Sequence, residues 1–127
     1  MLNADVRAAI DNKALAHLAT VTPDGAPHAV PVFVTTLGER IAFFTGPHTR
    51  KARNLQQDPR VALSLASADN PFTPMVVRGR VVEWIDGDAG WALVDEIQIK
   101  YTGAPYPRGE ERVVAIIEPE RQTVGVG

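Results

Sequence analysis

A basic cluster at the start of a predicted helix is the part of the sequence best suited to chemistry. The preceding strand ends at Gly46, and the helix is expected to run until Pro59 stops it. Its first turn is crowded with positive charge, whereas the helix macrodipole favours negative charge there by roughly 0.3–1 kcal/mol per charge. The helix start therefore indicates an anion site, most naturally for a phosphate, which free backbone N–H groups would also favour. The candidate contacts are Thr45, His48, Thr49, Arg50, Lys51 and Arg53.

A simpler interpretation is that this cluster is the solvated basic face of a surface helix. Two features favour the anion site instead. The only acidic residue nearby, Asp58, lies at the far end of the helix, so the charges run against the macrodipole. The hydroxyls of Thr45 and Thr49 also supply hydrogen-bonding groups at the helix start, where either residue can act as the cap.

Other kinds of active site find little support. The sequence contains no GxSxG, Walker A or GxGxxG motif. His17 and His28 could face each other across a predicted hairpin, but an ordinary surface or half-buried role is favoured over a metal site. We therefore predict no metal site and assign no catalytic residue. Any reaction is expected to belong to a bound cofactor.

The composition sets the broad class of protein. The 127 residues are 45% hydrophobic and carry a formal net charge of −2, which favours one folded domain over residues 1–127 and argues against a nucleic-acid binder. There is no cysteine, so disulfides and cysteine-based metal sites are excluded. No apolar run approaches the roughly 18 residues of a membrane span, and we expect neither a leader segment nor a membrane partner. A cytoplasmic location is the expectation.

The predicted elements that must position the basic cluster are mostly strands joined by short turns. A first helix begins after Asn3, which can cap it, and a later one begins at Asp86 or Asp88. Polar loops are expected at 67–74 and 101–109. The predicted helices span 4–11, about 50–57 and 86–100, and the predicted strands span 14–22, 26–36, 41–45, 60–66, 75–85, 112–118 and, as a possible short addition, 123–126.

Two strand residues predict that the sheet is bent rather than flat. Pro31 cannot donate to a strand ladder, so it marks an edge, a bulge or an opening where backbone groups are left for a ligand. Gly79 lies in the middle of a long strand, as at a bulge or a sharp bend. Together with the absence of alternating helices, this predicts a mainly β protein, a small antiparallel barrel of six or seven strands with a few helices.

Most of the chain resembles the flavin- and deazaflavin-binding split β-barrel proteins, the pyridoxamine-phosphate-oxidase-like family. The resemblance runs from Leu15 to Trp84 and is carried by LATVTPDGAPHAVPVFV, FFTGPHTRKARNLQQDPRVALSL and VVRGRVVEW. A looser similarity follows in KYTGAPYP and RVVAIIEPERQTVGVG. The middle segment is the most specific part, because a Thr-Arg-Lys cluster opens a helix that ends in Asp-Pro-Arg-Val.

The resemblance implies a cofactor and places it. In this family the Ser/Thr-Arg-Lys cluster holds the cofactor phosphate, which here implies Thr45, Thr49, Arg50 and Lys51. The segment Val30, Pro31 and Val32 would lie beside the flavin or deazaflavin ring. The family is typically dimeric, with the cofactor at the interface, so a homodimer is expected.

The form of the motifs narrows the family branch. Pyridoxamine phosphate oxidases carry a C-terminal Arg-x-His motif, and this chain has no histidine after His48. TRKARNLQQDPRV and KYTG look more like the group that uses the deazaflavin coenzyme F-420, with FMN as the alternative. Arg53 would meet the anionic tail of F-420, as would Arg78 or Arg80 if their strand faces the site.

The sequence therefore indicates two possible functions. The first is an oxidoreductase that transfers a hydride between coenzyme F-420, or FMN, and a small electron-poor organic substrate. The second is a non-enzymatic carrier of a flavin, haem or related anion. The substrate lies beyond the sequence, because the shape of its pocket depends on the loops at 67–73 and 101–109.

Overall fold

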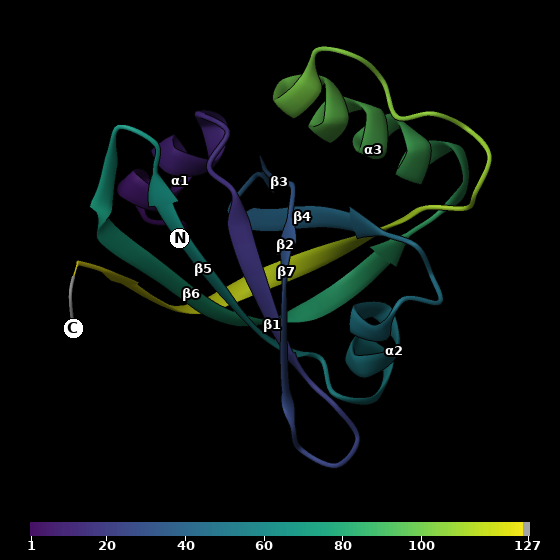
Figure 1. The fold of residues 1–127 in the computed structure, drawn as a ribbon, viewed down its shortest axis with the longest axis horizontal. Helices are drawn as coiled ribbons and strands as arrows, with labels where there is room; N and C mark the ends of the chain where they lie inside the picture. The colour runs from purple at the N-terminus through teal and green to yellow at the C-terminus, as the bar shows by residue number, and fades with distance from the viewer. Residues whose placement is uncertain (126–127) are drawn as a thin grey trace.

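A computed structural model describes residues 1–125 as one curled antiparallel sheet with three helices (Figure 1). Helices and strands do not alternate regularly along the chain, since most strands follow one another directly. The helices are α1 (Ala4–Asp11), α2 (Arg50–Gln57) and α3 (Gly87–Thr102), and the strands are β1 (Ala16–Val21), β2 (Pro27–Val32), β3 (Val34–Leu37), β4 (Arg40–Thr45), β5 (Arg60–Ser67), β6 (Asn70–Ile85) and β7 (Val113–Val124).

The order of the strands explains the curl. The seven strands lie in the order β2-β1-β5-β6-β7-β4-β3, so β2 and β3 are the two opposite edges of the sheet. Only Phe33 separates these two strands in the chain. One residue can join the two edges only if the sheet curls until they approach each other. This confirms the mainly β split barrel expected from the sequence, and Phe33 is the crossover between its edges.

Several predicted element boundaries were wrong. The return strand predicted over 26–36 is two strands on opposite edges of the sheet. The polar loop predicted over 67–74 is mostly strand, because β6 already begins at Asn70 and pairs with Ser67. The strands predicted over 112–118 and 123–126 are one strand, β7, up to Val124, and Val126 lies outside the described residues.

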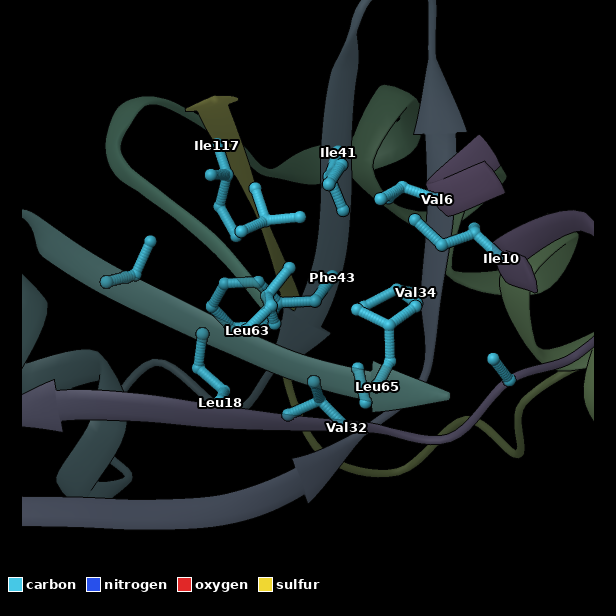
Figure 2. Packing of buried hydrophobic residues seen from close by; sticks show 14 of the residues in the cluster. Val6, Ile10, Leu18, Val32, Val34, Ile41, Phe43, Leu63, Leu65 and Ile117 are labelled. Atoms are coloured by element: carbon cyan, nitrogen blue, oxygen red, sulfur yellow. The ribbon is translucent and has the colours of Figure 1, made fainter. Parts of the chain in front are cut away.

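The core lies inside the curl and is closed at one end by α1. Inward side chains of all seven strands meet there. The helix α1 adds Val6 and Ile10 (Figure 2). Asn3 accepts a hydrogen bond from the N–H of Asp5 and so caps α1 as predicted. A second apolar cluster lies where α3 covers β4 and β7, and it includes Trp91, Leu93 and Val94.

The helix α2, which carries the basic cluster, is fixed to β1 by one buried polar pair. The side-chain amide of Asn54 donates to the hydroxyl of Thr20 over 3.0 Å, and both residues are buried. The carbonyl oxygen of Asn54 has no partner among residues 1–125. The amide therefore depends on Thr20 for its protein hydrogen bond.

Replacing Thr20 by valine is expected to destabilise the fold by about 1–3 kcal/mol. Valine keeps the shape of threonine but leaves the buried amide of Asn54 without its partner, which costs about that much. Denaturant unfolding would measure the loss. Thr123→Val, on an exposed part of β7, is the matched control and should stay within about 0.5 kcal/mol of the parent protein. An equal effect of both variants would contradict this role for the pair.

Candidate functional site

The start of α2 is organised around Thr49, its N-cap. The Thr49 hydroxyl donates to the carbonyl of Gly46 over 3.0 Å and accepts the N–H of Ala52 over 3.4 Å. The hydroxyl of Thr45 lies 2.8 Å from that of Thr49 and is left to donate to it. Thr45 is buried, so its hydroxyl supports the Thr49 hydroxyl from the interior side of the turn. This network fixes the turn from Gly46 to Thr49.

The network leaves backbone donors free at the start of the helix. The N–H of Ala52 is taken by the Thr49 hydroxyl and that of Arg53 by the Thr49 carbonyl, over 3.0 Å. The N–H groups of Arg50 and Lys51 precede them, and the first N–H groups of a helix have no partner within it. The first turn contains no acidic residue. The end of the helix thus offers an acceptor two N–H groups and a positive dipole.

A hollow of about 420 Å³ opens beside this turn, and we call it the helix-start hollow. One wall is the turn itself and the other is the segment that leads into β7. Its lining residues are Gly46, Pro47, His48, Thr49, Glu110, Glu111 and Arg112. The hollow is within the usual size of a small-molecule site.

Arg112 brings a guanidinium to the helix-start hollow, where its Nη1 atom lies 3.5 Å from a carboxylate oxygen of Glu110. Its guanidinium donates to the hydroxyl of Tyr106 over 2.9 and 3.2 Å and to the carbonyl of Glu111 over 2.7 Å. A methyl group added at Gly46 would lie 3.6 Å from its Nη1 atom. The side chain is only 18% exposed and is therefore held in place at the edge of the turn.

A second hollow of about 380 Å³ lies at the crossover between the edges of the sheet, and we call it the crossover hollow. It is largely apolar, with one cation. Its lining residues are Leu15, Pro31, Val32, Phe33, Phe44 and Lys51. Such a surface fits a flat ring system with a negative group at one side.

The two hollows are linked through aromatic contacts. Phe44, in the crossover hollow, packs edge-on against Tyr106 with ring centroids 5.3 Å apart. The hydroxyl of Tyr106 holds Arg112, which lines the helix-start hollow. Residues that line the two hollows are thus joined by direct side-chain contacts.

Lys51 is electrostatically unusual. Burial lowers its pKa below the usual 10.5, and the positive charge of Arg112 lowers it further. None of the residues 1–125 forms an ion pair with Lys51. A half-buried ammonium near another cation is costly. A bound anion would relieve that cost.

The structure brings together some of the predicted site residues and separates others. His48 and Thr49 line the helix-start hollow, whereas Pro31, Val32 and Lys51 line the crossover hollow. The other predicted residues line neither hollow. Thr45 lies behind Thr49, Val30 packs against the core, and Arg50 and Arg53 are exposed on α2.

Sequence reasoning missed the wall opposite α2. Arg112 reaches Gly46 because Thr45, the last residue of β4, pairs with Val113, the first of β7. That pairing joins segments almost 70 positions apart, and no local pattern reveals it. Phe33, Phe44 and Leu15 were missed for a similar reason, since they meet only when the sheet curls.

The structure does not bring together the residues of the other sites considered from the sequence. His17 pairs with Pro31 and His28 with Thr20, so the two histidines do not face each other across the hairpin. Residues 1–125 contain no group of three His, Cys, Asp or Glu side chains placed to hold a metal ion. Arg80 is engaged with Glu120 over 2.9 Å on the exposed side of β6. Within the same part of the chain, no helix has the length and apolar character needed to cross a membrane.

Comparison with known proteins agrees with this fold. Residues 2–123 match the family model described as pyridoxamine 5'-phosphate oxidase. An F-420 reductase of known structure is 28% identical, with a TM-score of 0.83 over 92% of this chain and 94% of that one. No curated protein matches the sequence.

Two further solved structures are similar. A conserved hypothetical protein of Mycobacterium tuberculosis is 25% identical, with a TM-score of 0.75 over 98% of this chain and 89% of that one. General stress protein 26 of Bacillus anthracis is 15% identical, with a TM-score of 0.73 over 95% and 91%. At 15% identity the last comparison supports the fold alone.

Proposed function

This chain belongs to the pyridoxamine 5'-phosphate oxidase family, and from that premise we propose that it is an oxidoreductase that binds coenzyme F-420. The observation that carries the proposal is the position of Lys51. It lines the apolar crossover hollow and lies at the start of α2, where two backbone N–H groups have no partner within residues 1–125. FMN is the alternative cofactor.

The residues present fit a phosphate-bearing flavin or deazaflavin. Lys51 is partly desolvated, its pKa is lowered, and it forms no ion pair among residues 1–125, as expected of a group whose partner is a bound anion. The crossover hollow offers a flat apolar wall from Pro31, Val32 and Phe33. The two features adjoin, as the ring and the phosphate chain of one molecule require.

Each residue then has a role in binding. The free N–H groups at the start of α2 hold the phosphate together with Lys51, and Thr49 fixes the turn that presents them, since its own hydroxyl hydrogen is donated to Gly46. Arg112, which is paired with Glu110 over 3.5 Å, places a guanidinium at the edge of the helix-start hollow. Thr45 positions the Thr49 hydroxyl. The bound cofactor supplies hydride chemistry at its ring, and the apolar wall orients a small electron-poor substrate on it and excludes water.

Coenzyme F-420 is preferred for two reasons. An F-420 reductase is similar over almost the whole length of both chains. Arg50 and Arg53 are also exposed beside the helix start, where they can meet an anionic tail that extends beyond the phosphate. FMN lacks such a tail, so it would leave both arginines in solvent.

We further propose that two copies of the chain complete the site. The crossover hollow is open on one side, and Leu15 in its lining is 47% exposed. A second copy placed there would cover both the ring and this leucine. The cofactor would then lie at the interface of a homodimer.

Side-by-side titration with F-420 and FMN tests the proposal. We expect micromolar or tighter binding of F-420, weaker binding of FMN, and one cofactor per chain in a particle with the mass of two chains. Reduced F-420 should then be oxidised faster than in buffer by members of a panel of quinones and nitroaromatics. Binding without turnover by any acceptor would favour a carrier, and binding of neither cofactor would refute the proposal.

A further inference from the structure

The segment KYTG has no role in the site described above, yet two of its residues reach the crossover. Lys100 and Tyr101 lie in the last turn of α3, which ends at Thr102. Figure 1 shows this end of α3 above β3. The chain thus brings a helix end to the point where the two edges of the sheet meet.

Tyr101 bonds to both sides of the split in the sheet. Its hydroxyl donates to the carbonyl of Ala14, just before β1, over 2.6 Å. It also accepts the N–H of Val34, the first residue of β3, over 3.3 Å. Its ring stacks on Phe33 with centroids 4.1 Å apart and planes within 7°.

Lys100 completes the attachment of Val34. Its ammonium group donates to the carbonyl of Val34 over 2.6 Å and to that of Ile10, at the end of α1, over 2.9 Å. Val34 lies on an edge strand, and its N–H and C=O point away from the neighbouring strand. Both are hydrogen-bonded to side chains of α3. Covering an edge in this way prevents the strand from pairing with another chain. Protection of the edge alone, however, would not require Tyr101 to stack on Phe33.

We propose that Lys100 and Tyr101 are positioning residues, a clasp that holds Phe33 and so sets the width of the crossover hollow. The contacts of the clasp fall on one residue that lines this hollow, Phe33, and on the neighbour of a second, since Ala14 precedes Leu15. None falls on the helix-start hollow. The clasp is therefore expected to govern the ring end of a ligand and to leave the phosphate end unchanged, an inference that rests on the proposed function.

Tyr101→Phe isolates the clasp, because it keeps the ring stacked on Phe33 and removes both hydrogen bonds of the hydroxyl. Thr102→Val is the matched control, since within residues 1–125 its hydroxyl bonds only to backbone groups at the same helix end, namely the carbonyls of Gln98 and Ala104 and the N–H of Ala104. Lys100→Met is a second variant, which removes the two carbonyl contacts from the other side.

The first measurement is amide hydrogen exchange in the protein without ligand. We expect the N–H of Val34 to exchange at least tenfold faster in Tyr101→Phe than in the parent protein, and Thr102→Val to leave it unchanged. Unchanged exchange in Tyr101→Phe would overturn the clasp, whatever the protein binds.

The second measurement compares FMN with riboflavin, which has the same ring and no phosphate. Tyr101→Phe and Lys100→Met should weaken both ligands by the same factor, about tenfold, and should alter the absorption spectrum of the bound ring at saturation. Thr102→Val should do neither. A loss confined to FMN would assign the effect to the phosphate end and overturn the proposal, as would unaltered binding and spectrum of both ligands.

The two proposals can fail separately. If the parent protein binds neither riboflavin nor FMN nor F-420, the proposed function falls and the link from clasp to ring falls with it. The exchange of Val34 then decides whether the clasp itself exists. If the parent protein binds these ligands and the variants bind them equally well, only the clasp is refuted.

Discussion

Replacing Lys51 by methionine is expected to weaken the binding of F-420 or FMN by roughly tenfold to a hundredfold. A hydrogen bond to a charged group contributes about 1.5–3 kcal/mol, and every 1.4 kcal/mol is a factor of ten in affinity. Fluorescence titration measures the loss. Riboflavin should bind equally well to both proteins, because it lacks the phosphate that Lys51 holds. An equal loss for riboflavin and FMN would place Lys51 against the ring instead.

The same substitution is expected to stabilise the protein when no ligand is bound. Lys51 is partly desolvated and lies near the positive charge of Arg112. Methionine has a similar length and carries no charge, so it removes both costs. Lys13→Met, at an exposed position that lines neither hollow, makes the same change in net charge and is the control. A Lys51 variant that loses stability while Lys13→Met does not would contradict this interpretation.

The lowered pKa of Lys51 also predicts the direction in which stability and ligand affinity change with pH. The pKa of Lys51 is lowered in the folded protein, so between that value and the usual 10.5 the unfolded chain holds more protons than the folded one. Stability without ligand should therefore rise with pH through this window. A bound phosphate favours the charged lysine, so the affinity should fall with pH over the same range. Both dependences should be absent in Lys51→Met.

The parts of the site that sequence could predict are those set by neighbours in the chain. Thr49 caps α2 because a hydroxyl at that position can accept the N–H of Ala52 three residues later. Gly46 and Pro47 precede it and end the strand, and Pro59 follows and ends the helix. Each of these preferences acts within a few residues, so the pattern survives in the sequence and the helix lies where it was expected.

The parts that could not be predicted depend on contacts between distant segments. The alternation of β2 continues smoothly toward β3, and only the curling of the sheet makes Phe33 a crossover. Pro71 and Pro74 suggested a loop, yet they lie in the first part of β6, before its pairing with β7 begins at Met75. Prolines are tolerated where a strand has a free side. The loop residue Arg112 became a site residue only through the pairing of β4 with β7.

Replacing Gly79 by alanine is expected to have the largest effect on stability, a loss of about 3 kcal/mol or more. The sheet is sharply bent at this residue, because β7 has an extra residue between the partners of Arg78 and Gly79. The backbone of β7 therefore approaches so closely that a methyl group would lie 2.1 Å from the carbonyl oxygen of Glu118. Backbone atoms on both strands would have to move, and such overpacking typically costs 1–3 kcal/mol and occasionally more.

Gly46→Ala is the matched control, because it also replaces a glycine by alanine but creates no clash with the backbone. A methyl group at Gly46 would meet its nearest neighbour, the Thr49 side chain, at 3.4 Å, an ordinary contact. Its unfolding free energy should stay level or rise slightly, because alanine restricts the unfolded chain. Denaturant unfolding of both variants measures the difference. Since β6 and β7 carry the bend that closes the sheet toward the crossover, Gly79→Ala should also weaken riboflavin binding. A Gly79→Ala protein as stable as Gly46→Ala would show that β7 does not approach this closely.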